Sequence, residues 1–253
     1  MVSLQTQMLF PTNMVGPPGP LPSGARHVET VAADGTELHG VYIGATAGRG
    51  DRTLVLGFGG NAWNGSDVAA YLHELFPQAE VVAFHYRGYK PSKGSPSAKA
   101  LIADAPLIYD FAVDLVKPRR VIVAGFSIGS GVAASLAARR KLDGLILVTP
   151  FDSLKAAAAD LYPWLPIGPF FEHEMDAAAF LEGSPVPVAI LAGERDSLIR
   201  PARTAALRAK VENPVYEFTA PGAGHNDIYQ RADFQQAMRE AYAKLSASES
   251  QEK

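Results

Sequence analysis

The chain reads Gly125-Phe126-Ser127-Ile128-Gly129 near its midpoint, and the residues on either side give this motif its meaning. Residues 120–124 form a short apolar run rich in β-branched side chains, which is typical of a buried strand. Residues 130–139 are mostly small and compatible with a helix. A G-x-S-x-G motif between a strand and a helix predicts a nucleophile elbow, a tight turn that exposes the serine, here Ser127.

The composition excludes several classes of protein. Lys and Arg number 23 and Asp and Glu 26, which gives a formal charge of −3, and no basic cluster stands out, so we expect no nucleic-acid partner. The chain has no cysteine, which excludes disulfides, zinc–thiolate sites and a cysteine nucleophile. No run of about 18 apolar residues occurs, so we expect no transmembrane segment. With no signal peptide at the N-terminus, the expected location is cytoplasmic, or peripheral to a membrane if the N-terminus is truncated.

The order of apolar runs predicts one α/β domain over residues 26–245, which is within the size of a single core. Apolar strands that alternate with helices predict a mostly parallel sheet covered on both faces. The prolines in residues 1–25 predict an extended N-terminal arm, and residues 246–253 a frayed tail. Strands are expected at 27–31, 37–43, 53–58, 81–84, 120–124, 144–148, 186–191 and 215–218, and helices at 66–75, 97–116, 130–139, 202–211 and 227–245.

A serine nucleophile needs a neighbouring base, and that base needs an acid to orient it. In sheets of this kind the three follow the order serine, acid, histidine. Asp196 follows the predicted strand 186–191, with Glu194 as a rival acid. His225 lies in a glycine-rich loop after the last predicted strand, and His85, at the end of an earlier strand, is its rival. Order and loop position favour Asp196 as the acid and His225 as the base.

Acyl transfer also needs two N–H donors for the developing oxyanion. One is expected from the backbone of Ile128, directly after the nucleophile. The other is expected from the backbone of Asn61, in the glycine-rich loop 57–63 that follows an early strand. The alternative interpretation of that loop is a glycine-rich turn with no part in catalysis.

Four further stretches carry a resemblance to a known family. With them the chain resembles an α/β-hydrolase, and more narrowly the serine-aminopeptidase-like, bud-emergence type of family, which also contains protein depalmitoylases and lysophospholipid lipases. The resemblance covers residues from about Gln7 to Tyr242. The stretches are Gly60-Asn61-Ala62, Tyr86-Arg87-Gly88-Tyr89 with Gly94-Ser95-Pro96-Ser97, Thr149-Pro150-Phe151-Asp152-Ser153-Leu154, and Gly224-His225-Asn226-Asp227-Ile228.

Two positions depart from the family pattern, and both lie in loops near the predicted site. Gly59 stands where the family has histidine, which loosens the packing of the oxyanion loop without removing its N–H groups. Lys90 replaces a glycine, so the turn after Tyr89 is expected to differ.

The resemblance also implies a cap inserted between the sixth and seventh strands, here short, at about 151–185. Aromatic residues in and near this insert could line an acyl or apolar pocket. The alternative, local core beneath a loop, carries equal weight. Arg87 is interpreted as a structural hydrogen-bonding group rather than an anion-binding one. The candidate pocket residues are Trp63, Tyr162, Trp164 and Phe170.

Together these features predict a serine hydrolase that cleaves esters or thioesters of apolar acyl groups through an acyl-enzyme, with no metal or cofactor. The expected partner is a small-molecule or acyl substrate. A peptidase, with Glu172 or Glu174 holding a substrate amino terminus, is the first alternative, and a non-catalytic binding module the second. The oligomeric state and peripheral membrane contact through Met8-Leu9-Phe10 stay open.

Overall fold

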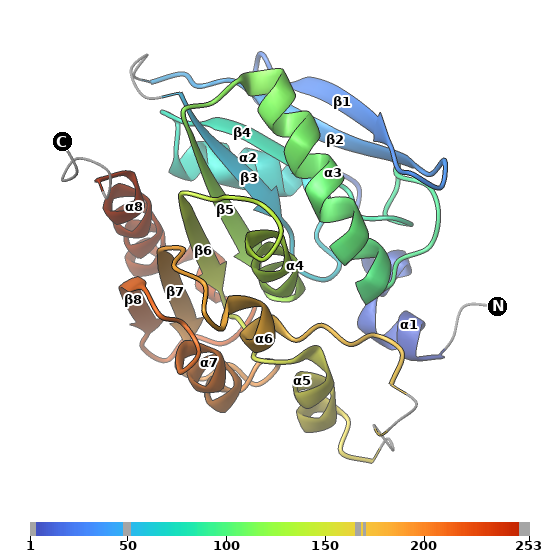
Figure 1. Ribbon diagram of the computed structural model, residues 1–253, viewed down its shortest axis with the longest axis vertical. Helices are drawn as coiled ribbons and strands as arrows, with labels where there is room; N and C mark the ends of the chain where they lie inside the picture. The colour runs from blue at the N-terminus through green and yellow to red at the C-terminus, as the bar shows by residue number, and fades with distance from the viewer. Residues whose placement is uncertain (1–3, 48–51, 165–167, 169–170, 248–253) are drawn as a thin grey trace.

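The computed structural model describes residues 4–47, 52–164, 168 and 171–247 (Figure 1). Within these residues eight strands form one sheet in the order β1-β2-β4-β3-β5-β6-β7-β8. Strand β2 is antiparallel to both of its neighbours, and the strands from β4 to β8 are parallel to one another. The strands are β1 (Arg26–Val31), β2 (Glu37–Ile43), β3 (Thr53–Phe58), β4 (Glu80–Phe84), β5 (Arg120–Phe126), β6 (Gly144–Val148), β7 (Val188–Gly193) and β8 (Pro214–Ala220).

Helices cover both faces of the sheet, as the alternating pattern of the sequence predicts. One hydrophobic cluster lies between the sheet and helices that include α3 and α4, and a second lies between the opposite face and α2 and α8. Every residue of β3, β5, β6 and β7 is buried, which explains their continuous apolar runs. The helices are α1 (Leu4–Leu9), α2 (Gly65–Leu75), α3 (Ala98–Val116), α4 (Ile128–Ala137), α5 (Leu154–Leu161), α6 (Ala177–Leu181), α7 (Pro201–Arg208) and α8 (Ala232–Ala247), with 3₁₀ turns η1 (Thr12–Met14) and η2 (Ile228–Gln230).

This architecture confirms the predicted fold class, an α/β-hydrolase fold built on a mostly parallel sheet. The bounds of β3 and β6 are those predicted. Helix α8 begins at Ala232, five residues later than predicted, because the short turn η2 separates it from the histidine loop. In the described part of the chain, no helix is both long enough and apolar enough to cross a membrane.

The N-terminal segment differs from the predicted extended arm, and for residues 4–9 that prediction is wrong. Here the chain forms helix α1, and Leu9 and Phe10 are only 9% and 2% exposed. Burial of these two apolar side chains stabilises the short helix, which ends where Pro11 follows. The proline-rich part after Val15 contains neither helix nor strand, as predicted.

The insert between β6 and β7 contains the two short helices α5 and α6. Ser153 caps α5 by accepting a hydrogen bond from the Ala156 N–H, and Asp176 caps α6 in the same way through Ala179. Ser153 and Asp176 also pair as an isolated antiparallel bridge, which holds the starts of the two helices together. Helix α5 therefore has a fixed place beside the carboxyl ends of the strands (Figure 1).

Candidate active site

Ser127 lies at the turn between β5 and α4 in a strained backbone conformation, with φ 50° and ψ −115°. The two glycines of its motif are sterically required. A Cβ added to Gly125 would lie 2.4 Å from the Gly129 carbonyl oxygen, and one added to Gly129 would lie 2.1 Å from that of Phe58. The Ser127 N–H donates to the Val148 carbonyl at 2.9 Å. Close backbone packing therefore holds the serine at the end of β5.

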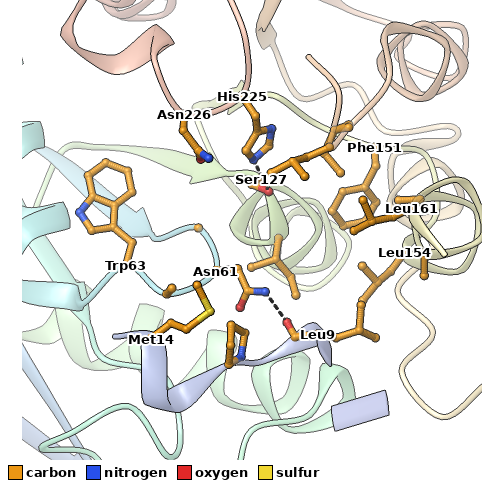
Figure 2. A pocket seen from close by; sticks show the side chains of 18 of the residues that line it. Leu9, Met14, Asn61, Trp63, Ser127, Phe151, Leu154, Leu161, His225 and Asn226 are labelled. Atoms are coloured by element: carbon orange, nitrogen blue, oxygen red, sulfur yellow. Dashed lines mark hydrogen bonds between the residues drawn. The ribbon is translucent and has the colours of Figure 1, made fainter. Parts of the chain in front are cut away.

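A continuous chain of hydrogen bonds joins Ser127 to a histidine and an acid. His225 Nε2 lies 3.1 Å from Ser127 Oγ, and His225 Nδ1 lies 2.7 Å from Asp196 Oδ2 (Figure 2 shows the first of these). The other oxygen of Asp196 accepts the N–H groups of Leu198 and Ile199 at 2.9 and 2.8 Å. The carboxylate is buried and oriented, so it can fix the His225 ring.

The rival acid and base lie in other contacts. Glu194 is exposed and accepts a hydrogen bond from the Gly222 N–H at 2.6 Å. His85 is buried, with Nδ1 3.3 Å from the Gly65 N–H and Nε2 3.2 Å from the Ser66 hydroxyl. Burial lowers the pKa of His85 to about 4, so this imidazole stays neutral near pH 7. The bonds of His85 tie the start of α2 to the end of β4.

The loop after β3 runs beside the nucleophile. A Cβ added to Gly60 would lie 3.7 Å from the Cβ of Ser127, and Asn61 and Ile128 line the same cavity as Ser127. Ile128 is the first residue of α4, where helix geometry leaves the backbone N–H without an intrahelical acceptor. Both predicted oxyanion donors therefore belong to backbone segments next to Ser127.

Two tyrosines hold this loop in place through their hydroxyl groups. The Tyr86 hydroxyl donates to the Gly59 carbonyl at 2.8 Å, and the Tyr89 hydroxyl donates to Asn61 Oδ1 at 2.8 Å. A Cβ added to Gly59 would lie 2.8 Å from Val68 Cγ2, so the position has no room for a larger side chain without movement of α2. The loop is thus braced although the histidine of the family pattern is absent.

Arg87, between the two tyrosines, has a structural role, as its sequence context suggests. Its guanidinium binds both oxygens of Asp104 at 2.6 and 2.7 Å, and its Nη1 reaches Thr36 at 3.0 Å. These bonds fix the Tyr86–Tyr89 segment between α3 and the β1–β2 turn.

A cavity of about 640 Å³ opens in front of Ser127 and His225. Among the described residues that line it, none is Asp, Glu, Lys or Arg, so the lining is mainly apolar with a few neutral polar groups. Among the described residues there is also no group of three His, Asp or Glu side chains that could hold a metal ion. The chemistry that these groups can supply is nucleophilic attack with proton transfer.

The predicted pocket residues have different outcomes. Trp63 and Tyr162 line the cavity, and Trp63 also packs edge-on against Phe126, with ring centroids 5.1 Å apart. Trp164, in contrast to that expectation, is not among the residues that line it, and it is 70% exposed. Phe170 lies outside the described residues.

Sequence reasoning missed much of the cavity wall. One side comes from the cap and the acid loop, through Phe151, Leu154, Leu161, Leu198 and Ile199. The N-terminal segment supplies another, through Met8, Leu9, Pro11 and Met14. The apolar run Met8-Leu9-Phe10 was the one available signal, since an apolar cluster in a polar arm needs a surface to pack on.

Comparison with known proteins supports the fold. A sequence model of the alpha/beta hydrolase fold matches residues 54–180. The uncharacterized protein Rv2307c of Mycobacterium tuberculosis is 34% identical over 220 residues, which cover 83% of this chain and 77% of that protein. Lysophosphatidylserine lipase ABHD12 of Danio rerio is 32% identical over 126 residues, 45% of this chain and 33% of the lipase.

Among solved structures, the Pyrococcus furiosus esterase Pf2001 superposes with a TM-score of 0.68 at 19% identity, covering 90% of this chain and 99% of that one. At this identity the likeness concerns the fold alone. The sheet order, the strained serine turn and the sequence matches lead to one assignment: the chain belongs to the α/β hydrolase fold family.

Proposed function

We propose that this protein is a serine hydrolase that cleaves carboxylic esters or thioesters of apolar acyl groups through an acyl-enzyme. The observation that carries the proposal is the hydrogen-bonded series Ser127–His225–Asp196 at the wall of an apolar cavity. A serine hydroxyl becomes a strong nucleophile only where a base can take its proton, and this arrangement supplies one.

In the first half-reaction the Ser127 Oγ attacks the substrate carbonyl carbon while its proton moves to His225 Nε2. A C–O bond forms, and the carbonyl oxygen becomes an oxyanion that accepts the Asn61 and Ile128 N–H groups. When the oxyanion collapses, the bond to the leaving oxygen or sulfur breaks, and His225 returns the proton to that atom. Asp196 holds the imidazole in place and stabilises its charged form.

In the second half-reaction water takes the place of the serine. His225 accepts a proton from the water as its oxygen attacks the acyl-enzyme carbonyl, and a second oxyanion forms at the same two N–H groups. Collapse releases the acid, and the proton returns to Ser127. Every proton and bond is accounted for without a further reactant.

The apolar lining favours an ester or thioester over the peptidase alternative. An aminopeptidase needs a carboxylate for the substrate ammonium group, yet no described residue lining the cavity is acidic. Glu174 instead accepts the Met175 N–H at 3.0 Å outside the cavity. The partial similarity to a lysophosphatidylserine lipase adds weight to an ester substrate. The strained turn at Ser127 argues against a protein that only binds. Such a conformation costs about 1–3 kcal/mol of stability, and the need to expose a nucleophile accounts for that cost.

The test is hydrolysis of p-nitrophenyl esters from acetate to palmitate by the wild type and by Ser127→Ala. We expect turnover by the wild type and a loss of at least about 10³-fold in the variant, while Ser184→Ala, a serine in the turn after α6, retains full activity. Labelling by a fluorophosphonate probe should likewise depend on Ser127. Normal turnover by Ser127→Ala would remove the proposed nucleophile, and release of arylamine from aminoacyl arylamides without ester turnover would favour the peptidase.

A further inference from the structure

The N-terminal strap, residues Leu4–Met14, forms one side of the active-site cavity. It comprises α1 and η1 and lines the same cavity as Ser127 and His225. Figure 2 shows Leu9 and Met14 across the cavity from His225. The strap is therefore placed where it can touch a substrate bound at the serine.

The strap is fixed by contacts with two other elements. Asn61 Nδ2 donates to the Leu9 carbonyl at 2.6 Å, which joins the strap to the oxyanion loop (Figure 2). Thr6 Oγ1 lies 2.8 Å from His173 Nε2, which joins it to the cap insert. Phe10 anchors the middle: it is 2% exposed and packs edge-on against His173, with ring centroids 5.2 Å apart. The strap is thus tied both to the oxyanion loop and to the cap insert.

The two ends of the cavity differ in chemistry. Figure 2 shows Phe151, Leu154 and Leu161 on one side of Ser127, and Trp63 and Asn226 on the other. Asn226 directly follows the histidine that must protonate the leaving atom, so a polar leaving group fits that side. The apolar side then receives the acyl chain.

Leu9 extends this apolar surface beyond Leu154, and the strap then leads along the cavity to Met14, on the side of Trp63 (Figure 2). Leu9 is nearly buried beside Asn61, whereas Met14 is 68% exposed although it lines the cavity, which puts it at the mouth. A short acyl group at Ser127 fills only the inner part of a 640 Å³ cavity. A long chain continues toward the mouth and buries apolar surface against the strap.

We propose that the N-terminal strap is the wall that selects the acyl chain, and that the substrates are esters or thioesters of long, uncharged acyl groups. Leu9 contacts the chain next to Leu154, and Met14 contacts the part of a long chain that follows the strap to the mouth of the cavity. The proposal rests on the proposed function for the location of the carbonyl carbon, and it adds a specificity element that the sequence pattern of the triad does not contain.

The experiment compares chain-length profiles of kcat/KM on p-nitrophenyl acetate, octanoate and dodecanoate. Met14→Ala should lower the ratio of dodecanoate to acetate by about threefold to tenfold, the loss expected for one or two methylene-sized contacts. Leu9→Ala should also lower the ratio of kcat/KM on octanoate to that on acetate. The matched control is Val31→Ala, an apolar side chain 58% exposed on β1 and away from the cavity, which should keep the wild-type profile. Thermal unfolding shows whether the Leu9→Ala variant is folded. Because Met14 is exposed, Met14→Ala is the variant whose folding should be least affected.

A second measurement separates this proposal from the proposed function. Binding of dodecanoate to Ser127→Ala, followed by calorimetry, should weaken about threefold or more when Met14→Ala is added. If the wild type hydrolyses no ester but this binding depends on Met14, the proposed function fails and the strap retains its role. Profiles within twofold of the wild type in both folded strap variants, or no binding of dodecanoate, would overturn the inference.

Discussion

Replacing Gly129 by alanine tests how close backbone packing sets the position of the serine. The new Cβ would lie 2.1 Å from the Phe58 carbonyl oxygen and 2.6 Å from that of Gly59. Both contacts are far inside van der Waals distance, and both partners are backbone atoms at the end of β3, which cannot rotate away as a side chain can. Either α4 or the loop that leads to Asn61 must move.

The cost follows from this geometry. Overpacking of a well-packed core costs about 1–3 kcal/mol, and two backbone clashes put Gly129→Ala at about 3 kcal/mol or more. For a chain of this length 1 kcal/mol corresponds to about 2–4 °C in Tm, so the Tm should fall by about 6–12 °C. Ester turnover should also fall at temperatures where the variant is folded, because the displaced carbonyls of Phe58 and Gly59 lie three and two residues before the proposed oxyanion donor Asn61.

The assay is thermal unfolding followed by circular dichroism, with p-nitrophenyl ester turnover measured well below the Tm. Gly60→Ala is the matched control for stability, since its added Cβ would meet the nearest atoms, Phe126 O and Ser127 Cβ, at ordinary distances of 3.5 and 3.7 Å. Its Tm should stay within about 4 °C of the wild type. A Tm for Gly129→Ala within 2 °C of the wild type would refute the reasoning, because it would mean that α4 and β3 do not approach as closely as described.

Three further predictions concern the hydrogen bonds around the site. Asp196→Asn should lower kcat by about 10³–10⁴-fold with little loss of stability, since the amide oxygen still accepts backbone N–H groups but the histidine loses its charged partner. Tyr89→Phe removes the bond to Asn61 and should lower kcat about tenfold at unchanged KM, because loop position matters most in the transition state. Between pH 6.5 and pH 4 the titration of His85 alone should lower the free energy of unfolding by about 3 kcal/mol, because burial lowers the pKa of His85 from 6.5 to about 4 and the unfolded chain takes up the proton first.

Each of these predictions has a control variant or an outcome that would contradict it. Tyr216→Phe, which removes an exposed bond to Glu240, should leave kcat unchanged, and an equal effect of the two tyrosine variants would rule out a special role of Tyr89. If Asp196→Asn retained full activity, another group and not Asp196 would have to orient His225. For the pH effect, urea unfolding of His85→Gln should show a flatter decline between pH 6.5 and pH 4, and an identical decline would exclude His85 as its source.

The fold could be predicted because its signals are local. Each buried strand is a continuous apolar run bounded by turn residues, and the run 53–58 coincides with β3. The three residues Ser127, Asp196 and His225 could be found for a related reason. Each lies in the segment that follows a strand, and the carboxyl ends of parallel strands meet at one edge of the sheet, so the order of the strands brings these side chains together.

The cavity wall could not be predicted, because it depends on contacts between residues far apart in sequence. Trp164 has the aromatic side chain expected of a pocket residue near the cap, but it is 70% exposed, and nothing in its sequence context indicates this. Leu9 lies 52 residues from Asn61 and Thr6 lies 167 from His173, and no periodicity indicates either pairing. The proline content of residues 11–22 suggested an extended arm and hid the short helix before it.

The site therefore divides into two parts with different physical origins. The proposed catalytic groups follow from the sheet: the elbow is fixed by backbone atoms of β3 and α4, and the loop carrying Asn61 is braced by Tyr86 and Tyr89. The surface that would meet the acyl chain comes from peripheral segments, α5 and the N-terminal strap, which side-chain hydrogen bonds and a few buried apolar groups hold in place. Changes in the strap can alter the cavity without moving any strand, so acyl selectivity can vary while the geometry at Ser127 stays the same.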